Sequence, residues 1–234
     1  MENVHAERSA GWSVLCYVAV LILATLLNGS MPSTHIRASD VALALDSHRF
    51  ALLLGAWLTF PATAFFLWFL VGLRSYLSHA QEGRQEGLPT FALIAGVVMM
   101  ACGIFAAALA TAAIYASPDT FKDNALAGIY DTFVFMQGGL GYAPVSIFLL
   151  AAAHSMRRHE SAPSWLSSLG YLAAAGAAIA SLSIFFQDGF MAPGQTGPGF
   201  FGALPAAIWL VATGIVLIRH NSRSSASAST SAES

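Results

Sequence analysis

The chain has 234 residues, of which 56% are hydrophobic and only 9% are charged, and its mean hydropathy is +0.65. Because an average soluble domain carries roughly 25% charged residues, the composition excludes a disordered chain, a nucleic-acid binder with a basic surface and an ordinary cytosolic enzyme. The net charge of −2 favours no electrostatic partner. What remains is an integral membrane protein.

Six apolar windows are long enough to cross a bilayer, which takes about 20 mostly apolar residues. They are Gly11–Asn28, Arg49–Tyr76, Pro89–Ala116, Ala125–Ser155, Ser164–Gln187 and Phe200–Ile218. β-Barrel strands would alternate over about ten residues, whereas these windows are continuous and rich in Ala and Leu. The sequence predicts an all-α fold, a polytopic membrane helical bundle of six transmembrane helices.

The N-terminal end is interpreted as a retained helix rather than a secretory signal, because Glu2 and Glu7 precede the apolar run and no A-x-A site follows. Ser39 opens a capped short helix that continues to Asp46 in the first outer loop, and this helix is expected to lie along the membrane surface.

Basic residues predict the orientation of the bundle. Arg37, Arg49 and Lys122 occupy the first, third and fifth loops. The N-terminus, the other two loops and the C-terminus carry Arg8, Arg74, Arg84, Arg157, Arg158, Arg219 and Arg223. This excess places both termini in the cytoplasm, as expected for a multi-pass protein of the cytoplasmic membrane.

The chain divides into three predicted parts. Residues 1–10 form a cytoplasmic N-terminal segment, residues 11–220 form the six-helix transmembrane domain, and residues 221–234 form a disordered cytoplasmic tail rich in Ser and Ala.

Three helices share a proline at one predicted depth. Pro61, Pro144 and Pro205 each precede a cytoplasmic arginine by 13 or 14 residues, about 20 Å along a helix. One interpretation is a set of three helical hairpins whose kinks open an outward-facing cavity. The alternative is coincidence, because transmembrane helices tolerate proline.

Residue size suggests which helix faces are inside. The third and fifth windows are rich in Ala and Gly, so we expect them to form the packed interior. The bulky group Phe65, Phe66, Trp68 and Phe69 is expected to face lipid or a neighbouring subunit.

Several kinds of membrane chemistry are excluded by residue placement. All seven histidines fall at interfaces or in loops, so no pair could ligate a transmembrane haem. Lys122, the only lysine, lies in a loop and cannot form an intramembrane Schiff base. Cys16 and Cys102 stand alone in separate windows and are interpreted as buried apolar side chains rather than a redox pair. The sequence predicts no catalytic residue, metal site or cofactor.

Polar residues at the outer helix ends form the candidate ligand site, an outer vestibule between the second, fourth and fifth helices. Its predicted members are His48, Asp131, Gln137, Tyr142, Gln187 and Asp188. Gln137 lies about 30 Å along the helix from Arg157, at the edge of the hydrocarbon. Gly138, Gly139 and Gly141 weaken this helix before Pro144, where unwound backbone could bind a ligand. The alternative is that the glycines permit close helix crossing and the polar groups are ordinary helix ends.

Four segments carry a family resemblance. They are His48-Arg-Phe-Ala-Leu-Leu-Leu-Gly, Leu70-Val-Gly-Leu-Arg, Ala162-Pro-Ser-Trp-Leu-Ser-Ser-Leu-Gly and Ile208-Trp-Leu-Val-Ala-Thr-Gly. Together they resemble uncharacterised bacterial six-helix inner-membrane proteins of actinobacterial type, classed as a domain of unknown function. The resemblance implies a helical bundle in a bacterial cytoplasmic membrane and supplies no ligand residues.

Two functions follow as hypotheses. The first is a non-enzymatic bundle that acts as an accessory subunit or binds partners or lipophilic ligands. The second is a small transporter or substrate-binding component that uses the outer vestibule. The lipid bilayer is the expected environment, a homo-oligomer and a membrane complex remain the partner alternatives, and no nucleic acid is expected. A closed apolar core around Gln137, Gly141 and Pro144 would argue against the transporter.

Overall fold

The computed structural model describes residues 2–28, 38–79, 87–115 and 123–232, and this part of the chain is helical and contains no strand. In chain order the elements are α1 (Glu2–Asn28), α2 (Ala38–Ser47), α3 (Arg49–His79), α4 (Leu88–Tyr115), α5 (Asp123–Phe135), η1 (Met136–Leu140), α6 (Tyr142–Arg158), α7 (Ser164–Ser181), η2 (Leu182–Phe185), α8 (Thr196–Pro198), η3 (Gly199–Ala203) and α9 (Leu204–Ala232). Of the η elements, η1 and η3 are π-helices and η2 is a 3-10 helix.

Six stretches of this chain are long and apolar enough to cross a membrane, which confirms the six predicted helices. The fourth stretch is composite, because α5, η1 and α6 follow one another with only Gly141 between η1 and α6. The predicted short helix in the first loop is α2. Helix α9 extends beyond residue 220, where the predicted tail begins, and the side chains past Arg219 lie outside the described residues.

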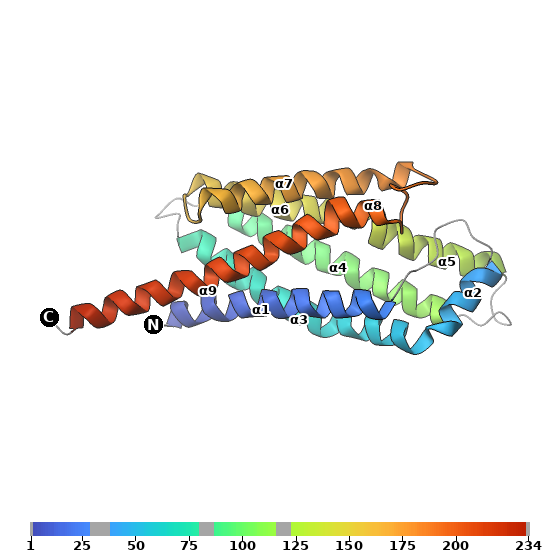
Figure 1. Ribbon diagram of the computed structural model, residues 1–234, viewed down its shortest axis with the longest axis horizontal. Helices are drawn as coiled ribbons and strands as arrows, with labels where there is room; N and C mark the ends of the chain where they lie inside the picture. The colour runs from blue at the N-terminus through green and yellow to red at the C-terminus, as the bar shows by residue number, and fades with distance from the viewer. Residues whose placement is uncertain (1, 29–37, 80–86, 116–122, 233–234) are drawn as a thin grey trace.

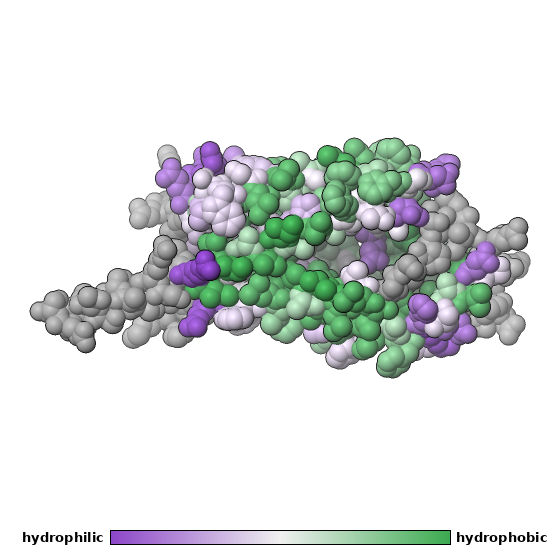
Figure 2. Space-filling view, viewed as in Figure 1, coloured by the Kyte–Doolittle hydropathy of each residue, from purple (hydrophilic) through white to green (hydrophobic). Residues whose placement is uncertain are grey.

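The six long helices form a closed ring. Helix α1 packs against α3 and α9, and the ring continues from α3 through α4, α6 and α7 back to α9. Both chain termini lie at one end of the bundle, and α2 lies at the other (Figure 1). We call these the terminal end and the α2 end. A hydrophobic belt separates the hydrophilic residues of the two ends (Figure 2), as a membrane-spanning bundle requires.

Helices α1 and α9 come very close to each other near the terminal end. A Cβ added to Gly11 would lie 2.8 Å from the carbonyl oxygen of Gly214, and one added to Gly214 would lie 2.7 Å from Val14 Cγ1. Glycines let transmembrane backbones approach in this way. Toward the α2 end the two helices separate (Figure 1).

Four aromatic rings fill the centre of the ring of helices. Phe66 lies 4.7 Å from Tyr17 and 5.7 Å from Phe148, and Phe148 lies 5.9 Å from Trp209, measured between ring centroids. Three of these rings follow the aligned prolines by about one helical turn, since Phe66, Phe148 and Trp209 come four or five residues after Pro61, Pro144 and Pro205. The three proline helices therefore meet in one aromatic cluster.

The predicted lipid-facing group on α3 was only half right. Trp68 is 57% exposed and Phe65 is 36% exposed, but Phe66 and Phe69 are fully buried. The buried pair lies on the same stripe of α3 as Ala62 and Leu73, which are also buried, because residues three, four and seven apart share a helix face. Bulk alone did not indicate the inward side. The small residues of α7 are interior as predicted, including Ala173 and Ala177.

Candidate functional site

The candidate site is a cavity of about 300 Å³ in the α2-end half of the bundle, which we call the lateral cavity. Its walls come from α1, α3, α4 and the composite span α5–η1–α6, with Leu45 of α2 at its rim. Helices α7 and α9 contribute no lining residue. The volume is at the lower limit for small-molecule sites, which are typically apolar with a few placed polar groups.

Helix α4 supplies the widest wall of the lateral cavity. Gly103, Ala106, Ala110 and Ala113 recur every three or four residues and so lie on one face of the helix, where they line the cavity. Their short side chains leave space that larger residues would fill. Met99, Met100 and Cys102 complete this wall with soft sulfur-containing side chains.

The polar part of the lining is small and uncharged. Gln137 and Tyr142 lie on the wall made by the composite span, with Tyr130 one helical segment before them. Thr59 of α3 and Tyr17 of α1 complete the polar groups. Among the described residues that line the cavity, none is Asp, Glu, Lys, Arg or His.

The π-helix η1 determines which side chains face the cavity. The amide of Gly141 donates to the carbonyl oxygen of Met136, five residues earlier, at 2.9 Å. Five residues of an α-helix would advance the chain roughly 140° past a full turn, whereas residues five apart stack in a π-helix. Gln137 and Tyr142 are five apart, so the π-turn brings both onto the cavity wall.

The other side of η1 is wedged by the chain that follows α7. Ser183 donates to the carbonyl oxygen of Gly138 at 2.9 Å. A Cβ on Gly138 would lie 2.8 Å from the amide nitrogen of Gly194, and a Cβ on Gly139 would lie 2.7 Å from Ile184 Cγ2. Gly138 and Gly139 therefore permit close packing against the α7 side, as the second interpretation predicted. The same glycine-rich segment is also irregular, as the first interpretation predicted.

The ring of Tyr142 is held by the second π-helix. A Cβ on Gly202 of η3 would lie 2.5 Å from Tyr142 Cε1 and 2.9 Å from Ala180 Cβ. The tyrosine thus rests on a flat glycine surface between η3 and α7. Both π-helices end shortly before a proline, Pro144 or Pro205, whose missing N–H already breaks the α-helical hydrogen-bond pattern.

The structure brings together only part of the predicted outer vestibule. Gln137 and Tyr142 line the lateral cavity, while Asp131 is half-buried beside Tyr130 and outside the lining. His48, an exposed residue between α2 and α3, does not line it either.

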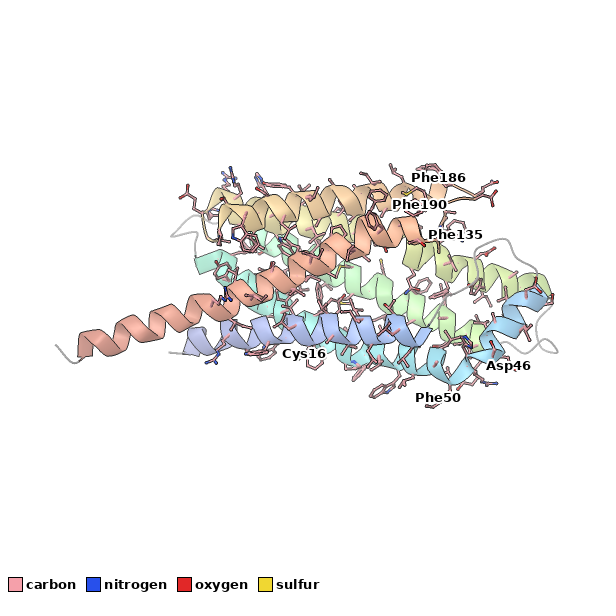
Figure 3. All side chains as sticks on the ribbon, in the orientation of Figure 1. Cys16, Asp46, Phe50, Phe135, Phe186 and Phe190 are labelled. Carbon is pink, nitrogen blue, oxygen red and sulfur yellow. The ribbon has the colours of Figure 1, made fainter. Side chains whose placement is uncertain are left out.

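The two remaining vestibule residues, Gln187 and Asp188, are exposed beyond η2. They lie between Phe186 and Phe190, which Figure 3 places on the edge of the bundle opposite Asp46 and α2. The cavity is therefore bounded by the first four spans, and the fifth lies behind η1.

Sequence reasoning missed the contribution of α4. A small-residue face that packs against a neighbour and one that borders a cavity look the same in sequence, and the third window was interpreted as packed interior. The cysteines are free, as predicted. Cys16 is exposed on α1 rather than buried, and points away from the bundle (Figure 3), whereas Cys102 lies on the cavity wall.

The lateral cavity opens through the side of the bundle. Leu21 of α1 lines the cavity and is 40% exposed, and Gln137 is also exposed. Figure 2 shows the surface hollowed beside α1, on the face where α1 and α9 separate toward the α2 end. At its other end the cavity reaches Tyr17, Ala62 and Val145, next to the aromatic cluster.

The fold and the cavity define a multi-pass α-helical membrane protein. Residues 9–214 match the model of a family described as a domain of unknown function, DUF4386, and the chain belongs to that family. This confirms the predicted resemblance to an uncharacterised domain. No curated protein and no solved structure matches the chain.

Proposed function

We propose that this protein binds a lipophilic ligand that it takes from the bilayer into the lateral cavity. The observation that carries the proposal is an apolar cavity that opens through the wall of a membrane bundle. A lipophile leaving the hydrocarbon for such a cavity keeps its apolar surroundings and gains close packing with the small-residue wall of α4.

The depth of the opening supports access from lipid. Leu21 follows Arg8 by 13 residues, about 20 Å along α1. Because the hydrocarbon core is about 30 Å thick, Leu21 and the opening fall within its outer part when Arg8 lies at the cytoplasmic surface. A ligand reaches the cavity there without crossing a headgroup layer.

The transporter alternative draws less support from the same geometry. A transported substrate would have to pass the aromatic cluster, whose rings Phe66, Phe148 and Trp209 are each at most 1% exposed. None of the three lines the lateral cavity. A binding role, alone or as an accessory subunit, needs no such passage.

Filling the cavity tests the proposal. A Cβ on Gly103 would meet only Met100 Cε, at 3.8 Å, so Gly103→Leu adds volume to the cavity without displacing backbone. Gly128 of α5 is exposed, and a Cβ there meets nothing within 4 Å, so Gly128→Leu is the matched control.

The full-length protein in phosphatidylcholine nanodiscs would be photolabelled with a diazirine derivative of hexadecane, and labelled residues would be mapped by mass spectrometry. We expect labelling of the cavity face of α4 in the wild type and in Gly128→Leu, and its loss in Gly103→Leu. Exposed Ile94 reports ordinary lipid contact and should be labelled in all three proteins. Equal labelling of the cavity face in all three would refute the proposal.

A further inference from the structure

The second inference concerns the polar end of the ligand and rests on the proposed function. We propose that the lateral cavity selects an uncharged lipophile whose single polar group, a hydroxyl or a carbonyl, hydrogen-bonds with Gln137 and Tyr142. Lipophiles with an ionised headgroup are excluded.

The lining provides no countercharge for an ionised headgroup. An ion taken out of water is strongly destabilised unless an opposite charge or several hydrogen bonds compensate it. Asp131 is next to Tyr130 in sequence but does not line the cavity. Arg49 begins helix α3, one of the cavity walls, but its guanidinium lies over the ring of Tyr115, 5.2 Å from the centroid, and outside the lining.

The polar groups that are present match a neutral partner. The amide of Gln137 offers donors and an acceptor, and the phenol of Tyr142 can donate or accept. Both a hydroxyl and a carbonyl can be satisfied by this pair. The amide also needs a partner itself, because an unpaired polar group at membrane depth is costly.

The backbone indicates that these two groups act together. Only the π-turn brings Gln137 and Tyr142 to the same wall, and π-turns inside α-helices are frequent at functional sites. Gly202 holds the Tyr142 ring from behind, so its position is set by packing before any ligand arrives. The remaining walls are apolar, which leaves the tail of the ligand to α1, α3 and α4.

The test compares two probes that differ only in head charge: a diazirine derivative of hexadecanol and its sulfate ester. Both are added to the full-length protein in phosphatidylcholine nanodiscs, and labelling of the α4 cavity face is quantified. We expect the alcohol to label this face roughly tenfold more than the sulfate.

Two variants locate the polar contact. Gln137→Leu removes the amide at similar size, and Tyr142→Phe removes only the hydroxyl while the ring stays against Gly202. Each should weaken alcohol labelling roughly fivefold, the effect of one lost neutral hydrogen bond. Gln187→Leu, at an exposed site outside the cavity, should leave it unchanged. Unchanged labelling in both cavity variants would overturn the assigned contacts.

The outcomes separate the two proposals. If the sulfate labels the cavity as well as the alcohol does, and Gly103→Leu abolishes both signals, the uncharged headgroup is wrong and the lipophile-binding function stands. If neither probe labels the cavity face, both proposals are overturned. The wild-type comparison of the two probes needs no variant and therefore does not depend on how well a variant folds.

Discussion

Trp209 is the residue on which most of the central packing converges. Its side chain is fully buried, its Nε1 donates to the carbonyl oxygen of Leu166 at 3.2 Å, and its ring meets Phe148 edge to face. Gly170 lies so close that a Cβ there would be 2.7 Å from the indole nitrogen. A buried indole N–H needs an acceptor, and here the bond ties α9 to α7.

Replacing this indole tests its role in stability. Trp209→Phe removes the hydrogen bond, worth about 0.5–1.5 kcal/mol, and leaves a void beside Gly170, so we expect a lower Tm of the purified protein in detergent. Trp165 is 53% exposed at the start of α7, and Trp165→Phe should leave Tm nearly unchanged. Equal melting of the two variants would contradict the central role of Trp209.

Among the elements, η1 has the largest effect on the site. It follows α5 without a break, and its five-residue turn changes which faces of α5 and α6 are aligned. Tyr130 and Phe133 before the turn, and Tyr142 and Val145 after it, line one cavity as a result. The element therefore acts as a register shift within a single span.

The π-turn depends on a glycine at its end. A Cβ on Gly141 would collide with the carbonyl oxygen of Met136, the acceptor of the π hydrogen bond. Gly141→Ala must displace backbone at a cost of about 1–3 kcal/mol, typical of overpacking, so we expect both a lower Tm and weaker cavity labelling. Gly128→Ala meets open space and should gain slightly from the higher helix propensity of Ala, by up to about 1 kcal/mol. A Gly141→Ala protein as stable as Gly128→Ala would show that the turn tolerates a side chain.

The elements also show what the sequence could and could not predict. Hydropathy and length located all six spans, and the acidic and polar ends of residues 39–46 located α2, because these signals are local. Helix faces were harder: α3 is apolar around its whole circumference, so nothing in its periodicity distinguished Phe66 and Phe69 from Phe65 and Trp68. The glycines before Pro144 marked η1 as irregular. The five-residue turn that brings Gln137 to Tyr142 depends on packing against Ser183 and Gly194, which are distant in sequence.

At the scale of the whole molecule, charge is confined to the two ends. Arg8, Arg74, Arg157 and Arg219 are exposed at the terminal end, while Asp40, Asp46 and Asp188 are exposed at the α2 end. Arg37, Arg84 and Lys122, which also entered the predicted orientation, lie outside the described residues. The described arginines are thus concentrated where both termini lie, as the positive-inside rule expects for a cytoplasmic end.

Reporter fusions test this orientation. Green fluorescent protein fused after Ser234 should fluoresce, and alkaline phosphatase at the same site should be inactive, because the C-terminus is predicted to be cytoplasmic. Fusions after Lys122, in the predicted third loop, should give the opposite pattern. Active phosphatase at the C-terminus would reverse the orientation and place the lateral cavity in the cytoplasmic half of the membrane.

The contact between Gly11 and Gly214 has a consequence for how the protein is made. These glycines belong to the first and last spans, so the ring of helices stays open until the end of synthesis, since chains emerge from the N-terminus onward. Until α9 arrives, α1 has only α3 as a neighbour in the ring, and the central cluster lacks Trp209. Assembly therefore ends with a single closing step, in which the last helix to enter the membrane meets the first and completes the aromatic centre beneath the cavity.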